Sequence, residues 1–258
     1  MNNKVNKNLI ISMLFVPLSL HAAPSSDISV AEIDCLLEPN MTIELSSPVA
    51  GVLDKVLVDR SDKIKKGQIV ALLKSEVEKV QVRSSEEKVN LSRVESERAI
   101  ELYADNVITL SEKELSDHEL KINELELERS KAILERRKIR SPIRAVVADR
   151  YLMPGEYVDD NPVVKIAQLD PLRVEIITSV DFFGKIKKGM HAHVTTELES
   201  INNNLVAKVV LVDRVIDAAS GTFGIRLELR NKRSKIPGGL KCKVKFFTDE
   251  EEAAYKKK

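Results

Sequence analysis

Two stretches of sequence decide the fold: residues 46–73, SSPVAGVLDKVLVDRSDKIKKGQIVALL, and residues 140–167, RSPIRAVVADRYLMPGEYVDDNPVVKIA. They align without a gap at a constant offset of 94 residues, so that Ser47-Pro48-Val49 falls on Ser141-Pro142-Ile143. Identities are few, but the apolar columns coincide, and each copy reads as short strands broken by turn-forming residues. About 30 residues cannot bury a two-sided core alone. We therefore expect the copies to pack on each other around a pseudo-twofold axis as one small β-sandwich.

A charged segment without Gly or Pro separates the two copies. Gly and Pro are absent from residue 68 to residue 141, and 29 of the 65 residues 74–138 are charged. Such a segment is too long for a loop inside a compact domain, and its Glu, Lys, Arg and Leu content favours helix. The turn-like pair Asp105-Asn106 divides it into helices at about 76–104 and 111–138. We expect an antiparallel coiled-coil hairpin, roughly 40 Å long at about 1.5 Å per residue.

Heptad-spaced residues predict how the two helices face each other. The first helix carries apolar residues with polar ones at the intervening seam positions: Val77, Val80, Leu91 and Val94, with Ser84, Glu87, Arg98 and Glu101. The second helix carries two sets: Leu115, Ile122, Leu125, Ala132 and Ile139, and Leu120, Leu127 and Leu134. We predict a seam built from these positions. Because one stripe per helix suffices, surplus apolar positions are expected to face neighbours in an assembly.

The remaining segments predict an exported protein with a second β domain. Residues 1–23 have the order of a cleaved secretory signal: two lysines, an apolar run at 9–20 that is too short to span a bilayer, and Ala22-Ala23. Residues 24–42 are an N-terminal segment. Residues 170–248 contain alternating runs typical of half-buried strands, which predict a small β-barrel: 172–177, 191–194, 204–211, 224–229 and 241–246. Residues 249–258 are a charged tail that we expect to be disordered.

Composition and motifs argue against nucleic-acid binding and against catalysis. The chain has 41 Lys+Arg and 40 Asp+Glu, so it lacks the basic excess of phosphate-binding proteins. The sequence contains no Gly-rich phosphate loop, no GxSxG and no HExxH motif. His191 and His193 share one strand face, but two histidines on an exposed barrel strand are the favoured interpretation because no third ligand is near. We predict no catalytic residue, no cofactor and no metal site.

The two cysteines, Cys35 and Cys242, lie near the two ends of the exported chain. An even count in an exported protein permits a disulfide. Two buried free thiols are the alternative, and the residues alone leave both open. Both cysteines border the predicted barrel, and a bond between them would close a long loop. We therefore predict that they are bonded.

The order of these parts resembles the periplasmic adaptor subunits, or HlyD-like membrane fusion proteins, of Gram-negative tripartite efflux systems. The resemblance covers about residues 35–247. Residues 43–52, 62–68, 140–143 and 154–158 look like lipoyl-type halves, and residues 170–174, 186–190, 220–223 and 236–240 look like the adaptor barrel. It implies a mainly β fold with a long α-helical insertion. A lipoyl-like barrel-sandwich hybrid of residues 43–73 and 139–169 is split by the coiled-coil hairpin of residues 74–138 and followed by the β-barrel of residues 170–248.

The resemblance also implies a function and partners. Such adaptors are non-catalytic and link an inner-membrane transporter, here of resistance-nodulation-division type, to an outer-membrane TolC-like channel as a hexameric conduit in the periplasm. The family docks its hairpin tip through Arg, a Leu four residues on and a Ser seven further. Arg98, Leu102 and Thr109 hold these positions, and Ser111 takes the last role if the turn is shifted. Longer adaptors continue into a membrane-proximal domain, which this sequence is not expected to form.

Three other functions fit parts of the pattern. One is a stand-alone periplasmic scaffold that self-assembles through its hairpin, and another is an adaptor of a type I secretion system or an ABC exporter. The third is a swinging-arm carrier. Carriers resemble one another in presenting a modified Lys where their two lipoyl halves join, and here the charged helical segment occupies that junction. Co-purification of an outer-membrane channel would distinguish an adaptor from a scaffold.

Overall fold

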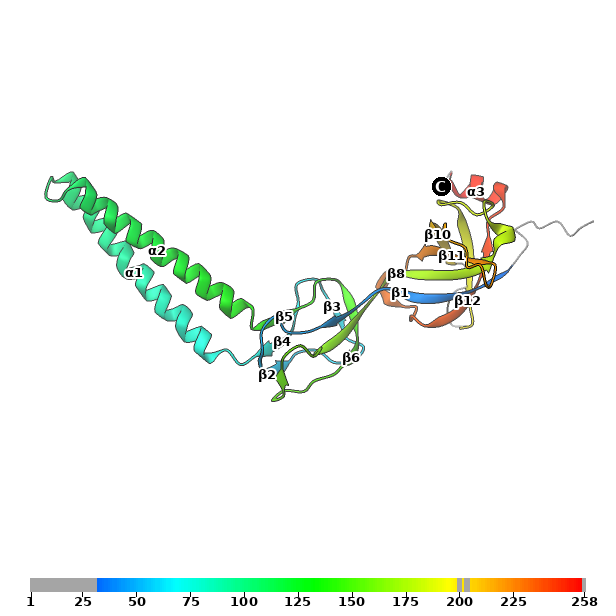
Figure 1. Ribbon diagram of the computed structural model, residues 1–258, viewed down its shortest axis with the longest axis horizontal. Helices are drawn as coiled ribbons and strands as arrows, with labels where there is room; N and C mark the ends of the chain where they lie inside the picture. The colour runs from blue at the N-terminus through cyan, green and yellow to red at the C-terminus, as the bar shows by residue number, and fades with distance from the viewer. Residues whose placement is uncertain (1–31, 199–200, 202–204, 257–258) are drawn as a thin grey trace, which may run out of the picture.

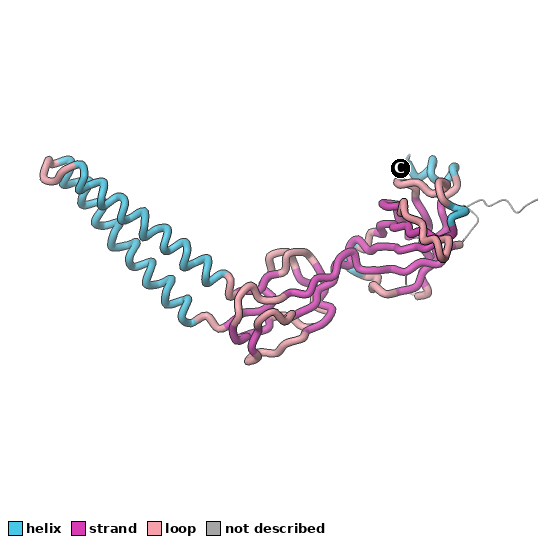
Figure 2. The backbone as a smooth tube through the Cα atoms, viewed as in Figure 1, coloured by secondary structure: helices cyan, strands magenta, loops and turns pink. Residues whose placement is uncertain are grey.

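The computed structural model describes residues 32–198, 201 and 205–256. The predicted signal at residues 1–23 lies outside these described residues. The molecule is elongated, with a helical hairpin, a β-sandwich and a β-barrel arranged in a row (Figure 1). Strand and loop make up the sandwich and most of the barrel, whereas the hairpin is helical almost throughout (Figure 2). Within the described ranges, no helix combines the length and apolar character needed to cross a membrane.

The sandwich consists of two four-stranded layers. One layer contains the adjoining ends of β1 (Ile33–Leu45) and β8 (Val164–Ser179), with β6 (Ala145–Arg150) and β3 (Lys63–Ile64). The other contains β5 (Lys138–Arg140), β4 (Ile69–Leu73), β2 (Gly51–Val56) and β7 (Tyr157–Val158). Their inner faces enclose an apolar core that includes Leu53, Ile64, Val158 and Ile166. Neither copy of the repeat could build this core alone.

The strand pairing confirms the pseudo-twofold repeat. Gly51 of β2 pairs with Val158 of β7, and Ala145 of β6 pairs with Ile64 of β3. Each pair becomes the other when 94 is added to the residue of the first copy and subtracted from that of the second. The two halves therefore exchange equivalent strands across the sandwich.

The turns of the two halves match as well. The Oγ atom of Ser47 donates to the carbonyl oxygen of Val49 at 2.5 Å, and that of Ser141 donates to Ile143 at 2.7 Å. This local side-chain bond fixes the turn that starts each copy. The shared Ser-Pro pair thus has a structural cause in both places.

The barrel is closed by six strands. In order around it they are β1, β12 (Leu240–Phe246), β9 (His191–Thr196), β10 (Leu205–Val212), β11 (Thr222–Leu229) and β8, and β1 also pairs with β8. The 3₁₀ turns η1 (Val180–Phe182) and η2 (Lys232–Ser234) lie between strands. Treating residues 24–42 as a separate segment is wrong from Ile33 onward. Cys35 and Leu37 point into the barrel core because β1 completes the barrel.

Two strands run from the sandwich into the barrel without a break. The pairing of β1 with β8 extends from Leu45↔Val164 to Cys35↔Ile176, with one register shift between Pro39 and Met41. A pair of continuous, hydrogen-bonded strands restricts bending between the two β domains far more than a flexible linker would. The two β domains are thereby connected as one strut.

The prediction of a disordered tail is wrong. Residues Asp249–Lys256 form the helix α3, which packs on β9. Its Glu252 carboxylate accepts a bond from the backbone N–H of His191 at 3.0 Å and lies 2.9 Å from the Nδ1 atom of that residue. Thr248 and Glu251 form a capping box that starts the helix. His191 and His193 are consequently half-buried rather than exposed.

The hairpin consists of α1 (Glu76–Ala104) and α2 (Leu110–Glu135). The second helix starts one residue earlier and ends three residues earlier than we predicted. Lys138 and Ile139 belong to β5, and Ile139 is buried in the sandwich core. The apolar periodicity continues past the end of the helix because a core residue of the sandwich falls on the same spacing.

The predicted seam of the first helix is also wrong. The buried residues of α1 are Val82, Ser85, Val89, Ser92, Ser96 and Ala99, which form a heptad series of small side chains. Val77 and Leu91 are 79% and 62% exposed. On α2 the half-buried residues Leu120, Leu127 and Leu134 share the heptad register of buried Ser130. The Oγ atoms of Ser85 and Ser130 lie 3.1 Å apart across the seam.

Small side chains explain this choice of seam. Serine and alanine occupy little space, so the two helices approach closely while the leucines of α2 fill the remaining volume. The larger apolar residues of α1, Val77, Val80, Leu91 and Val94, face outward as a second heptad series. Leu115, Ile122 and Leu125 do the same on α2. Both outer stripes are thus available to other molecules.

Candidate docking site at the hairpin tip

The turn between the two helices has a defined geometry. The N–H of Asn106 donates to Tyr103, and the N–H of Val107 donates to Leu102 at 2.8 Å. Asn106 has a φ of 60°. These bonds and this left-handed residue form a Schellman motif, which ends α1 and satisfies its last carbonyls. Asn tolerates the left-handed conformation, so the predicted turn at Asp105-Asn106 has a physical basis.

Thr109 starts the second helix. Its Oγ1 accepts from the N–H of Glu112 at 3.2 Å, and its own N–H donates to Glu112 Oε2 at 2.7 Å. This is a capping box, in which each residue satisfies the other's backbone donor. The Thr109 hydroxyl also donates to the same carboxylate at 2.8 Å. Thr109 therefore shapes the tip, and Ser111 lies inside the helix and not at its start.

The capping box also sets the electrostatics of the turn. The backbone N–H of Thr109 first, and its hydroxyl second, hold the pKa of the Glu112 carboxyl below its ordinary value of 4.5. A stabilised anion at the start of α2 also suits the positive end of the helix dipole. Glu112 is therefore a fixed negative charge on the rim of the tip.

A shallow groove of about 240 Å³ lies on one flank of the tip. It is lined by apolar and charged side chains from both helices: Glu95, Arg98, Ala99, Leu102, Ile108, Glu112 and Ser116. The structure thus brings Arg98 and Leu102 together, while Thr109 stands outside the groove and orders its edge. Ile108 and Glu112 were not predicted. Their positions beside the Asn106 turn and in the capping box were the signals that could have found them.

Arg98 lines this groove and is exposed to solvent. Within the described part of the chain, its guanidinium takes part in no ion pair and no side-chain hydrogen bond. An arginine fork pairs well with carboxylates and carbonyl oxygens. The apolar floor at Leu102 and Ile108 suits an apolar side chain between such polar contacts. The groove thus combines an exposed guanidinium with apolar side chains from both sides of the turn.

A polar network below the groove fixes the two helices in register. The Ser96 hydroxyl donates to the Asp117 carboxylate at 2.7 Å, and the Lys113 ammonium lies 2.6 Å from the same carboxylate. Lys113 first, and Ser96 second, hold the pKa of Asp117 below its ordinary value. Because this network crosses from one helix to the other, it keeps the two sides of the groove opposite each other.

The other predicted site residues lie in the barrel. Cys35 and Cys242 face each other on β1 and β12, and a disulfide joins them. His191 contacts Glu252 and the ring of Tyr255, and His193 contacts the ring of Phe247. Among the described residues, no group of three or more His, Cys, Asp or Glu side chains could hold a metal ion.

Known proteins share this architecture. Residues 41–168 match the family of CzcB-like barrel-sandwich hybrid domains. Over 192 residues the chain is 23% identical to an uncharacterized protein of Haemophilus influenzae, covering 74% of this chain and 50% of that protein. It is 20% identical over 215 residues to the cation efflux system protein CzcB of Alcaligenes sp., covering 77% and 41%. The chain thus spans half or less of the length of these curated relatives.

Solved structures show the same fold. A MacA–MexA chimeric protein that contains the MexA α-hairpin domain of Pseudomonas aeruginosa superposes with a TM-score of 0.69 at 19% identity, over 84% of this chain and 80% of that one. The membrane fusion protein Spr0693 of Streptococcus pneumoniae gives a TM-score of 0.63 at 12% identity, over 85% and 99%. Residues 41–168 therefore form a CzcB-like barrel-sandwich hybrid domain, and the chain shares the fold of split sandwich, inserted hairpin and barrel with these solved structures.

Proposed function

We propose that the protein is a non-catalytic periplasmic adaptor that links an inner-membrane transporter to an outer-membrane channel of the TolC type. The tip groove carries the proposal. It places an exposed, unpaired guanidinium beside an apolar floor at the far end of a long shaft, where a partner can reach it without meeting the rest of the chain. The barrel lies at the opposite end of the molecule (Figure 1). A groove at one end of a strut and a separate β domain at the other suit a link between two membranes.

The outer stripes of the hairpin support assembly into a conduit. The hairpin is a two-helix coiled coil whose seam uses one heptad register, and the exposed apolar residues occupy another. In a two-helix pair these outward positions of α1 and α2 lie on opposite sides. A contact between the α1 stripe of one copy and the α2 stripe of the next is head-to-tail, and such contacts close into a ring when the rotation between copies divides a full turn. We propose a homo-oligomer of this kind, a hexamer in the working assembly.

The transporter end is proposed from the relatives. The chain is similar to a cation efflux system protein over 77% of its length, and we propose a transporter of resistance-nodulation-division type. We place the mature chain in the periplasm after removal of residues 1–23. The alternative of a self-assembling scaffold explains the outer stripes, but it gives no role to Arg98 and its groove.

Capture of the channel by tip variants tests the proposal. Arg98→Asp reverses the charge at the groove, and Leu102→Asp places a charge on its floor. Loss of a desolvated interfacial arginine costs about 2 kcal/mol or more, roughly a thirtyfold weaker complex, whereas a rim charge costs less than about 1 kcal/mol. Arg93→Asp is the matched control, because Arg93 is an exposed arginine on the same helix away from the groove.

The outcomes separate the two functions. We expect Arg98→Asp and Leu102→Asp to lose co-purification of the channel from cross-linked envelopes, while Arg93→Asp retains it and all three variants keep the wild-type melting temperature. Wild-type capture by Arg98→Asp would disprove the role of the groove. If even the unaltered protein recovers no channel but forms homo-oligomers, the scaffold is the correct function.

A further inference from the structure

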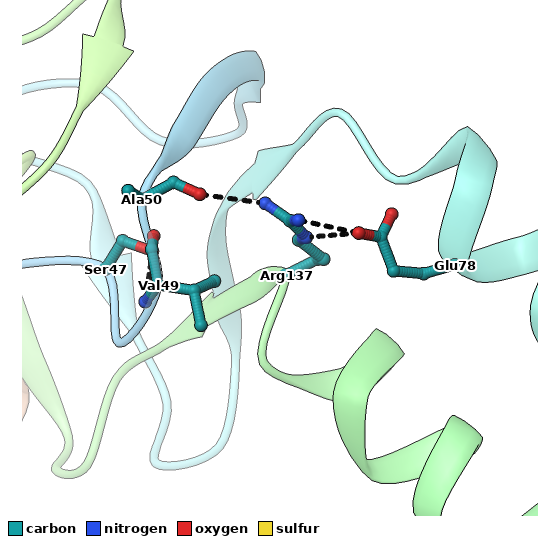
Figure 3. A network of polar contacts seen from close by, with 5 residues as sticks. All are labelled: Ser47, Val49, Ala50, Glu78 and Arg137. Carbon is teal, nitrogen blue, oxygen red and sulfur yellow. Dashed lines mark hydrogen bonds and ion pairs between the residues drawn. The ribbon is translucent and has the colours of Figure 1, made fainter.

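A polar network fastens the base of the hairpin to the sandwich (Figure 3). Its centre is Arg137, which follows the last turn of α2. The Nε and Nη2 atoms donate to Glu78 Oε1 at 3.0 and 2.6 Å, and Nη1 donates to the carbonyl oxygen of Ala50 at 2.9 Å. Glu78 lies in the first turn of α1, and Ala50 lies in the loop between β1 and β2. One side chain thus connects both helices of the hairpin to the sandwich.

This ion pair is shielded from water. The side chains of Arg137 and Glu78 are 24% and 14% exposed, whereas those of Lys131 and Glu86, which pair across the shaft, are 55% and 43% exposed. A shielded, charge-assisted pair with good geometry is stronger than an exposed one. Arg137 and Glu78 are therefore suited to hold two parts of the molecule together.

The sandwich is shaped to receive the guanidinium. A Cβ atom at Gly51 would lie 2.7 Å from Arg137 Nη1 and 3.0 Å from Leu73 Cδ2. Only glycine leaves this space open. The neighbouring Arg136 donates to the carbonyl oxygen of Pro48 at 3.1 Å. Consecutive arginines therefore bind the carbonyls of the same loop, and the loop fits closely against one of them.

The backbone adds to the same joint. The N–H of Leu73, at the end of β4, donates to the carbonyl oxygen of Arg137 at 2.9 Å, and the N–H of Lys74 donates to Val52 at 2.9 Å. These bonds hold the two chain connections between hairpin and sandwich side by side. The barrel joint is already restrained by the continuous strands β1 and β8. The hairpin joint is instead crossed by the two short connections 74–75 and 136–137, so its direction depends on the contacts made there.

We propose that Arg137 is a positioning residue that locks the hairpin in one direction on the sandwich. The locked joint fixes where the tip points, so the barrel end sets the position of the tip groove. The consequence for channel docking rests on the proposed function, but the locking itself can be measured on the isolated protein. Glu78, Ala50 and Gly51 complete the lock.

Distances between spin labels test the lock. Labels are attached to cysteines introduced by Glu119→Cys on α2 and Lys66→Cys on the sandwich, both exposed positions, with the Cys35–Cys242 disulfide kept intact. Double electron–electron resonance spectroscopy then gives the distribution of distances between the two spin labels. Arg137→Ala removes the lock, and Gly51→Ala displaces the guanidinium without removing a charge. Arg137→Lys keeps the charge but cannot serve Glu78 and Ala50 together. Lys131→Ala is the control, because it breaks an ion pair confined to the shaft.

We expect a broad distribution in Arg137→Ala and Gly51→Ala, an intermediate one in Arg137→Lys, and the wild-type distribution in Lys131→Ala. The amide hydrogens of Leu73 and Lys74 should exchange roughly ten- to a hundredfold faster in Arg137→Ala, the change expected when a charged hydrogen-bond pair loses one partner. Helicity should stay constant. Unchanged distances and exchange in folded Arg137→Ala would overturn the proposal.

Channel capture separates this proposal from the adaptor function. Arg137→Ala should weaken capture while the tip residues remain intact. Broadened distances with wild-type capture would overturn the positioning role. Failure of the wild-type protein to capture any channel would overturn the adaptor function and leave the measured lock unaffected.

Discussion

Two substitutions at neighbouring residues, Leu91→Ala and Ser92→Leu, test which face of α1 packs against α2. Leu91 is 62% exposed, so removal of its side chain beyond Cβ loses only a minor part of the roughly 1.5–3 kcal/mol that full burial contributes. Alanine is also the better helix former, so we expect Leu91→Ala to change the free energy of unfolding by less than about 1 kcal/mol. Ser92 is 2% exposed against α2. Ser92→Leu overpacks this site, and we expect a loss of about 1–3 kcal/mol.

Urea unfolding of dilute, monomeric protein, followed by far-ultraviolet circular dichroism, measures both values. Dilution matters because assembly through the outer stripes would add stability to the folded state. Val89→Ala and Val94→Ala are the matched controls, since they make the same chemical change at sites that are 4% and 50% exposed. Only Val89→Ala should be clearly destabilising. Equal losses at residues 89 and 94, together with a tolerated Ser92→Leu, would refute this seam and favour the one built on Val77, Val80, Leu91 and Val94.

Two further predictions concern the tip and the barrel. Because the folded-state pKa of Glu112 is lowered, its contribution to the start of α2 is present above the ordinary value of 4.5 and is lost as the pH falls through the lowered value. Thr109→Ala should raise the pKa of Glu112 in a carbon-detected NMR titration, and an unchanged pKa would contradict the capping box. We also predict that unreduced protein shows a Cys35–Cys242 linked peptide by mass spectrometry. Removing the disulfide in the double variant Cys35→Ala, Cys242→Ala should lower the free energy of unfolding by about 3–5 kcal/mol, because the bond joins residues 207 apart in the sequence. Alkylation of both cysteine thiols in the unreduced protein would contradict the disulfide.

The sandwich was predictable because its signal is redundant. Ser47 and Ser141 start the same turn in two places, and the apolar columns that follow fill one core from both sides. Each copy gives the same pattern of strands and turns, so either copy can be checked against the other. The hairpin was predictable for a different reason, since the absence of Gly and Pro over so long a segment leaves few alternatives to helix.

The closure of the barrel and the order of the tail were not predictable in the same way. β1 completes the barrel only by pairing with β12 and β8, which lie more than a hundred residues away, and no local pattern specifies such partners. The tail helix depends on the capping box at Thr248 and on the contact of Glu252 with His191. Charge composition alone indicated disorder, and the prediction failed because these tertiary contacts outweigh it.

The choice of seam was ambiguous for a physical reason that also bears on function. Two heptad series run along α1, and an α-helix with both can face its partner with either. Choosing the bulkier series assumes that a sequence puts its largest apolar residues into the contact inside its own chain. Here the small series, with the Ser85–Ser130 and Ser96–Asp117 contacts, holds the hairpin together. A monomer that needed only its own stability would gain from burying Val77, Val80, Leu91 and Val94. The homo-oligomer proposed above accounts for their exposure, because other copies would cover them in it.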